Sequence, residues 1–162
     1  MALRLSTERL TLRPWGSSDV DEYRALMVER GDGIPRVVEV RERIATHLAA
    51  AEQTGLALLV ICRRHEGDFI GYCGLTVHRS TIDEPEIAYE LVQRAHGLGY
   101  ATEAAQAVLG AAFATGRTRL WATVGSWNTP SFRVLEKLGF KRDHVTTKDD
   151  GEEVVWLTRV LR

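Results

Sequence analysis

Residues 96–102, with the sequence His-Gly-Leu-Gly-Tyr-Ala-Thr, lie where one periodic pattern of apolar residues gives way to another. Residues 86–91 alternate as a half-buried strand does, whereas residues 100–115 have the spacing of an alanine-rich helix. A Gly-x-Gly segment between a strand and a helix exposes the free amide groups of the helix N-terminus, where the helix dipole also favours an anion. The sequence therefore predicts a strand–loop–helix unit that binds a phosphorylated cofactor.

The other periodic segments predict a mixed sheet with helices on both of its faces. Strands are expected at 10–14, 57–62, 69–77, 86–91 and 119–124. Helices are expected at about 20–28 after caps at 17–19, and at 37–53, 100–115 and 130–138. Residues 141–147 and 154–161 read as an antiparallel pair around the turn Asp149-Asp150-Gly151. Hairpin-forming strands followed by two βα units indicate an α/β fold, and the length of 162 residues predicts a single domain over 1–162.

Composition narrows the class of protein. The net charge of −1 gives no support for a nucleic-acid partner. No apolar run approaches the roughly 20 residues of a membrane span, and the first residues lack the apolar segment of a signal peptide. Cys62 and Cys73 lie in apolar, strand-like runs, so buried thiols are expected rather than a disulfide. The five histidines have no metal-ligand spacing. We therefore expect a cytoplasmic protein with no membrane partner and no metal.

Two common nucleotide-binding motifs do not fit the loop at 96–102. A dinucleotide-binding unit needs a third glycine, where this chain has Thr102, and an acidic residue about 20 positions further on. The next strand, at 119–124, ends without an acidic residue. A Walker A loop needs Gly-Lys followed by Ser or Thr, which the chain lacks. The phosphorylated ligand must therefore be of another kind.

A second motif identifies that ligand through a family resemblance. Residues 128–140 have the sequence Asn-Thr-Pro-Ser-Phe-Arg-Val-Leu-Glu-Lys-Leu-Gly-Phe, and with residues 96–104 they resemble the Gcn5-related N-acetyltransferase (GNAT) superfamily. Residues 7–15, Thr-Glu-Arg-Leu-Thr-Leu-Arg-Pro-Trp, resemble the branch of Rim-type ribosomal-protein N-terminal acetyltransferases. The resemblance covers essentially the whole chain. It implies a GNAT-like fold, with a mostly antiparallel sheet whose fourth and fifth strands (86–91 and 119–124) splay apart, and helices on both faces.

The resemblance implies acetyl-CoA as the cosubstrate. In the family, the loop grips the pyrophosphate through backbone amides, and here that loop consists of Gly97, Leu98, Gly99, Tyr100, Ala101 and Thr102. The end of the preceding strand, at Leu91 and Val92, would pair with the pantetheine arm as an added strand does. Asn128 would contact the cofactor or order its turn, and Ser131 would lie near the sulfur. His96 stands where the family usually has Gln or Arg, so the expected grip rests on the backbone of 97–102.

Acetyl transfer from a thioester to an amine requires a general base and a general acid. An ammonium must lose a proton before it attacks, and a departing thiolate benefits from a proton donor. Glu86 matches the strand glutamate that several family members use as the base, and Glu90 lies two residues further along the same face. Each could equally be a solvated strand carboxylate. Many members use a tyrosine as the acid, but the matching residue is Leu135. The resemblance to Rim-type members implies Ser131 as the acid or sulfur ligand, and the alternative is a serine of the helix N-terminus with no catalytic role.

The resemblance implies direct transfer of an acetyl group to a primary amine, either a protein N-terminal α-amine or a small-molecule amine. The alternative is a non-catalytic module of the same fold that senses acyl-CoA, and a longer acyl donor is a weaker third hypothesis. Residues 29–35 and 144–152 are expected to line the acceptor side. The chain is expected to be a monomer or a homodimer.

Overall fold

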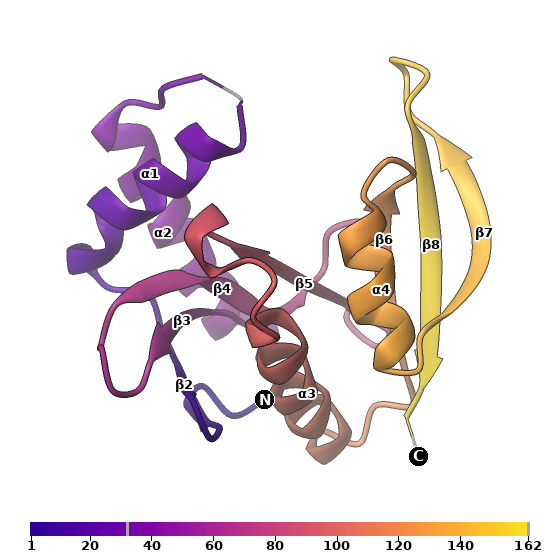
Figure 1. Ribbon diagram of the computed structural model, residues 1–162. Coiled ribbons are helices and arrows are strands. Elements are labelled where there is room, and N and C mark those ends of the chain that lie inside the picture. Colours follow the sequence, from indigo (N-terminus) through magenta and orange to yellow (C-terminus); the bar gives the residue numbers. More distant parts are fainter. Residues whose placement is uncertain (32, 162) are drawn as a thin grey trace.

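The computed structural model describes residues 1–31 and 33–161 of the chain. Within them, eight strands form one sheet in the order β1-β2-β3-β4-β5-β6-β8-β7 (Figure 1). The strands are β1 (Leu5–Ser6), β2 (Leu10–Arg13), β3 (Leu58–Arg63), β4 (Phe69–Thr76), β5 (Glu86–Leu91), β6 (Arg119–Gly125), β7 (Lys141–Thr147) and β8 (Glu153–Val160). The helices are α1 (Val20–Glu29), α2 (Val37–Thr54), α3 (Tyr100–Ala114) and α4 (Thr129–Lys137), with 3₁₀ turns at Ser17–Asp19 and Gln93–Ala95.

The expected α/β fold with a mixed, mostly antiparallel sheet is confirmed, and each expected strand and helix is present. The sequence analysis missed the two-residue strand β1, which pairs with β2 through Leu5 and Ser6. It also missed the 3₁₀ turn at Gln93–Ala95, which joins β5 to the glycine loop. Both segments are too short to show a periodic pattern. Pairing with β2 defines β1, and local hydrogen bonds from Ala95 to Val92 and from His96 to Gln93 define the turn.

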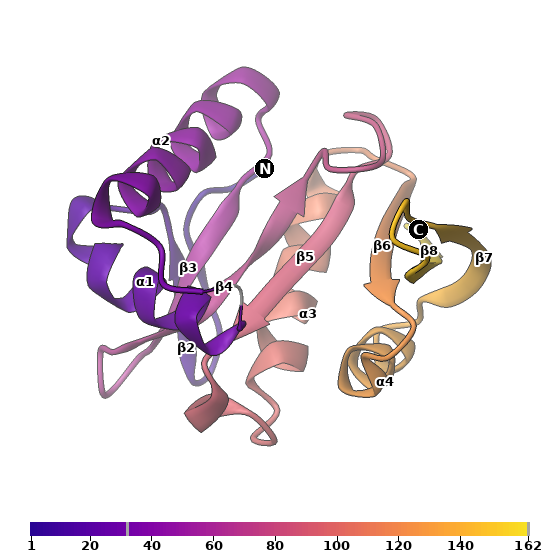
Figure 2. The ribbon, with the colours of Figure 1, turned by 90° about the horizontal axis from the view of Figure 1, so that it is seen from above.

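Helices cover both faces of the sheet, as Figures 1 and 2 show. Helices α1 and α2 pack against each other on one face, and α3 packs on the other face against β4 and β5. The side of α3 that faces the sheet consists of small residues with no exposed surface, namely Ala104, Ala105, Val108 and Ala112. Because these side chains are short, the helix lies close to the strands and its N-terminus lies near their ends.

The sheet opens between β5 and β6. Strand β5 pairs with β4 along its whole length, from Glu86 opposite Thr76 to Leu91 opposite Gly71. With β6 it forms a parallel pair at one position, Glu86 opposite Trp121, and the two strands then diverge (Figure 2). The splay expected for these strands is therefore confirmed. Helix α4 packs against β6 and α3, beside the open side of the wedge.

Candidate active site

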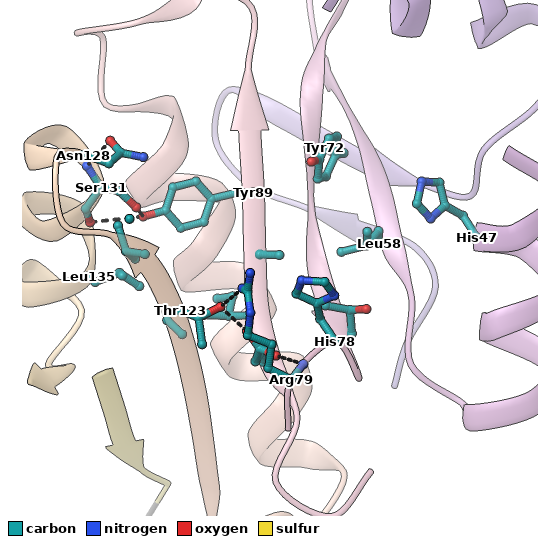
Figure 3. Close-up of a pocket in the computed structure, with 17 residues that line it drawn as sticks. His47, Leu58, Tyr72, His78, Arg79, Tyr89, Thr123, Asn128, Ser131 and Leu135 are labelled. Atoms are coloured by element: carbon teal, nitrogen blue, oxygen red, sulfur yellow. Dashed lines mark hydrogen bonds between the residues drawn. The ribbon is translucent and has the colours of Figure 1, made fainter. Parts of the chain in front are cut away.

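A cleft of about 400 Å³ lies where β5 and β6 separate (Figure 3). Residues of β3, β4, β5, β6, α2 and α4 line it, together with residues that follow β4. Among its polar residues are His47, Tyr72, His78, Arg79, Glu86, Tyr89, Thr123, Asn128 and Ser131. The cleft thus brings together segments that lie far apart in the sequence.

Glu86 is fixed at the closed end of the cleft. Its side chain is buried, and both carboxylate oxygens accept hydrogen bonds, one from the backbone N–H of Arg79 and the other from the Thr123 hydroxyl. The Arg79 guanidinium also donates to the Thr123 Oγ1 at 2.9 Å, as Figure 3 shows. Since Thr123 belongs to β6, this network links the two strands at the point where they part. A carboxylate is therefore held in a defined position on the cleft wall.

Glu90 lies two residues further along β5 and is engaged by α1. Its oxygens accept from the Arg30 guanidinium, with 3.1 Å between Oε2 and Nε, and from the Tyr72 hydroxyl at 3.3 Å. The structure thus brings Glu86 to the cleft, whereas the described cleft lining does not include Glu90. The bidentate pair ties the end of α1 to the sheet.

His47 lies on the α2 side of the cleft as a neutral imidazole. Burial, assisted by the charge of Arg43, lowers the pKa of His47 to about 4. The Tyr23 hydroxyl lies 3.0 Å from its Nε2, and the Trp15 ring stacks on it with 5.2 Å between ring centroids. Burial also raises the pKa of the neighbouring Tyr72, and the charge of Glu90 adds to that effect. At neutral pH both side chains are therefore uncharged.

The lowered pKa of His47 predicts a loss of stability in acid. Between pH 6.5 and about 4 the unfolded chain binds a proton at His47 that the folded chain does not, so the free energy of unfolding falls as pH falls. The upper bound of this effect is about 3 kcal/mol, and partial exposure of the ring reduces it. Urea unfolding of wild type and His47→Gln at pH 7, 6 and 5 measures it. We expect the free energy of unfolding to fall less between pH 7 and pH 5 in His47→Gln than in wild type. An equal fall in both proteins would contradict His47 as the cause.

The opposite wall of the cleft carries the serine and asparagine of the second motif. Asn128 caps α4, because its Oδ1 accepts from the Ser131 N–H at 3.4 Å. The Ser131 Oγ lies 2.9 Å from the hydroxyl of Tyr89, which reaches across from β5 (Figure 3). Leu135 also lines this wall, and its side chain has no ionisable proton. Asn128 therefore orders the turn, and Ser131 presents a hydroxyl at the cleft.

The glycine loop is preformed for close backbone approach. Gly97 and Gly99 have φ angles of +74° and +82°, a conformation that other residues rarely adopt. The α3 helix begins at Tyr100 with no side-chain cap, which leaves its first amide groups available. Arg9 braces the loop by donating to the Leu98 carbonyl at 3.0 Å.

Side chains from outside the glycine loop pack around it at the start of α3. The Arg9 guanidinium lies over the Tyr100 ring and forms an ion pair with Glu103 at 2.7 Å. A second hollow of about 620 Å³ lies at the start of α3, and its lining includes Gly99 and Thr102. Ala101 continues the first turn of the helix. The backbone of residues 97–102 is thus held by Arg9, which lies between β1 and β2.

The end of β5 modifies the expectation for Leu91 and Val92. The Val92 N–H donates to the Ile70 carbonyl at 2.9 Å, and the Val92 carbonyl accepts from Ala95 at 3.0 Å. The Val92 backbone is therefore not free to pair with a pantetheine arm. Because backbone direction alternates along a strand, the Leu91 N–H points away from β4, toward the side where β5 has no partner strand.

His96 and Arg94 have roles within the fold. The His96 Nε2 lies 2.9 Å from the Leu91 carbonyl, so the imidazole donates there and joins the loop to the end of β5. Arg94 pairs with Asp68 at 2.6 Å and donates to the Phe69 carbonyl at 2.8 Å. Arg94 is therefore held by the β3–β4 turn, where Asp68 also pairs with Arg63.

The two segments expected to line the acceptor side, 29–35 and 144–152, contact elements that border the cleft. The Glu29 carboxylate accepts from the Gln93 N–H at 3.1 Å, which places the end of α1 against the end of β5. Within 29–35, position 32 lies outside the described residues. At the other wall, Glu152 accepts from the Trp127 Nε1 at 2.7 Å, so the tip of the β7–β8 hairpin lies beside the loop between β6 and α4.

Two further findings concern ions and membranes. Across residues 1–31 and 33–161, no three His, Cys, Asp or Glu side chains form a group that could hold a metal ion. Over the same part of the chain, no helix is both long enough and apolar enough to cross a membrane.

Comparison with known proteins identifies the family. Residues 9–141 match the model of the acetyltransferase (GNAT) domain. The chain is 27% identical to the uncharacterized N-acetyltransferase p20 of Bacillus licheniformis in an alignment of 152 positions that covers 86% of this chain and 83% of that one. A putative GNAT-family acetyltransferase from Bordetella pertussis is 25% identical and superposes with a TM-score of 0.86, over 98% of this chain and 99% of that chain. The chain belongs to the GNAT acetyltransferase family.

The fold also resembles that of Rim-type enzymes. RimL, a ribosomal L7/L12 α-N-protein acetyltransferase solved in complex with coenzyme A, superposes with a TM-score of 0.85 at 15% identity, over 98% of each chain. At that identity the likeness concerns the fold. The resemblance expected from the opening motif is therefore confirmed at the level of architecture.

Sequence reasoning missed several side chains that shape the site, namely Arg9, Arg79, Tyr89 and Thr123. Tyr89 was hidden because alternation places it on the apolar face of its strand, where a tyrosine is ordinary core material. Its one available signal was the polar hydroxyl, which needs a partner when buried.

Proposed function

We propose that the protein is an acetyl-CoA-dependent N-acetyltransferase that moves an acetyl group directly to a primary amine. The observation that carries this proposal is the cleft between β5 and β6, with the Glu86 carboxylate on one wall and the Ser131 hydroxyl on the other. The preformed glycine loop lies at the start of α3, beside the end of β5. A phosphate-bearing thioester held by that loop would extend along β5 into the cleft.

The proposed cofactor contacts follow the geometry of the loop and the strand. The amides of residues 97–102 bind the pyrophosphate, with the Thr102 side chain at the edge of the second hollow. The free Leu91 N–H pairs with the pantetheine arm in place of a neighbouring strand. Asn128 holds the first turn of α4, so that Ser131 faces the thioester sulfur.

In the proposed reaction the amine nitrogen attacks the thioester carbonyl carbon, and the C–S bond of the resulting intermediate breaks. Glu86 acts as the base, through a water molecule where the acceptor does not reach it, and Ser131 supplies the proton to the departing sulfur. Glu86 is preferred over Glu90 because Glu86 lines the cleft, whereas the described cleft lining does not include Glu90. No enzyme nucleophile is needed.

An amine panel tests the proposal. The purified protein is supplied with acetyl-CoA and, in turn, peptides with N-terminal serine or alanine, amino-acid amides, polyamines and arylalkylamines, and free thiol is measured. We expect turnover with at least one amine, and a mass increase of one acetyl group on its nitrogen. Propionyl-CoA in parallel tests for a longer donor. Binding of acetyl-CoA without turnover would favour the alternative, a sensor module, and absence of both would contradict the proposal.

We also propose a cellular location, binding partners and an oligomeric state for the protein. The two cysteines are free and buried, which suits a reducing compartment, and we propose the cytoplasm. The partners we propose are acetyl-CoA and the amine acceptor, with no nucleic acid or membrane, for a monomer or homodimer. Light scattering of the purified chain with and without acetyl-CoA tests the last point.

A further inference from the structure

The hydroxyl of Tyr89 links the two walls of the cleft. Tyr89 belongs to β5 and Ser131 to the first turn of α4, 42 positions further along the chain. The Tyr89 hydroxyl donates to the Ser131 carbonyl oxygen at 3.2 Å, and its oxygen lies 2.9 Å from the Ser131 Oγ, a contact in which either hydroxyl can be the donor. In Figure 3 the Tyr89 ring spans the cleft and its hydroxyl points at Ser131.

A serine alone is a poor proton donor to a thiolate. Its hydroxyl is a much weaker acid than a phenol, and giving up its proton without replacement would leave an alkoxide in a partly buried site. One turn further along α4, Leu135 faces the same cleft and offers no proton. The phenol that contacts the Ser131 Oγ comes instead from the opposite strand.

The protonation state of Tyr89 suits a donor. Burial raises the pKa of Tyr89 to about 12, and the hydrogen bond with Ser131 offsets part of that rise. The phenol therefore carries its proton throughout the physiological pH range. When the Tyr89 hydroxyl turns from the Ser131 carbonyl to the nearer Ser131 Oγ, the Ser131 hydrogen is free to point into the cleft.

We propose that Tyr89 is a positioning residue for the departure of the thiol and acts through Ser131. The inference rests on the proposed function. As the C–S bond of the intermediate breaks, its electron pair goes to sulfur, which takes the Ser131 proton while Ser131 takes the Tyr89 proton. The phenolate then regains a proton from water. The attacking neutral amine gives one proton to Glu86, which passes it to solvent, as the amide forms, so one proton is lost and one is gained.

The test combines single and double substitutions with isotope measurements, using acetyl-CoA and the best amine of the panel. We expect Tyr89→Phe to lower kcat about 10- to 100-fold, and Ser131→Ala about 100-fold, with KM for acetyl-CoA within about threefold of wild type. In the Ser131→Ala background, Tyr89→Phe should change kcat less than about twofold, because the path is already broken. The dependence of kcat on the D₂O fraction should be curved in wild type, where two protons move, and linear in Tyr89→Phe.

Tyr23→Phe is the matched control. It removes the hydroxyl of a buried tyrosine that contacts His47 and belongs to α1, and we expect kcat within twofold of wild type. Phenylalanine retains the ring at either position, so thermal unfolding should show folded variants.

Three results would overturn the inference. They are wild-type kcat in Tyr89→Phe, an equal loss in both backgrounds, or a loss of kcat that parallels weaker acetyl-CoA binding and lower thermal stability. A wild-type protein that turns over no amine would remove the proposed function and this inference together. An active wild type with an equally active Tyr89→Phe would remove the inference alone.

Discussion

Gly71→Ala is expected to destabilise the protein by about 3–5 kcal/mol or more, the range of severe core defects. A Cβ atom built on Gly71 would lie 2.0 Å from the Glu90 carbonyl oxygen and 2.9 Å from the Leu91 Cα. Both are backbone atoms of β5, so relief requires the strand itself to move. The φ angle of Gly71 is +149°, which adds conformational strain for any residue with a Cβ.

The strain at Gly71 would also reach the cofactor side of β5. Gly71 pairs with Leu91 where the β3–β4 ladder shifts register next to it, so the end of β5 depends on this close approach. We therefore expect the folded fraction of Gly71→Ala to bind acetyl-CoA more weakly than wild type.

Thermal and urea unfolding measure the stability effect, and for a chain of this size we expect a fall in Tm of about 10 °C. Gly110→Ala is the matched control, because Gly110 lies within α3 and a Cβ there meets no atom within 4 Å. That change should stabilise the protein by about 0.5–1 kcal/mol. If the two variants unfolded at the same temperature, the close approach at Gly71 would not be a constraint on β5.

The sequence was sufficient to predict the order of strands and helices and the two motif-bearing segments, whereas the splayed sheet was predicted from the family resemblance. Periodicity located the strands and helices, and the glycines of the 97–102 loop indicated an anion site, because both features depend on local backbone geometry. The face shared by Glu86 and Glu90 also followed from alternation. These inferences needed no knowledge of how the elements pack.

The contacts that distinguish the site could not be read from the sequence. Whether Glu86 or Glu90 faces the cleft depends on where β6 leaves β5, and the single pair with Trp121 fixes that point. The contact of Tyr89 with Ser131 depends on the angle at which α4 crosses the wedge. His96 donates to Leu91 only because the 3₁₀ turn folds the loop back on the strand. Each of these contacts depends on how segments far apart in the sequence are arranged around the separation of β5 and β6.

Glu86→Gln is expected to lower kcat about 100-fold or more at pH 7, if Glu86 is the base that receives the proton of the amine. The amide retains the size of the side chain and one acceptor oxygen, but its NH₂ group must face either the Arg79 N–H or the Thr123 hydroxyl. The hydroxyl rotates to accept, so we expect a cost to folding of about 1–2 kcal/mol, within the range of one altered buried hydrogen bond. The variant should remain folded and should bind acetyl-CoA.

The pH dependence of kcat/KM in Glu86→Gln distinguishes a loss of proton transfer from a loss of structure. Without the base, only amine that is already deprotonated in solution reacts, and its fraction rises with pH. The ratio of wild-type to Glu86→Gln kcat/KM should therefore shrink between pH 7 and 9.5. Glu90→Gln, measured in parallel, breaks the pair with Arg30 and should cost less activity at pH 7 than Glu86→Gln. A deficit of Glu86→Gln that stays constant with pH, or a larger loss in Glu90→Gln, would assign the proton transfer to another group.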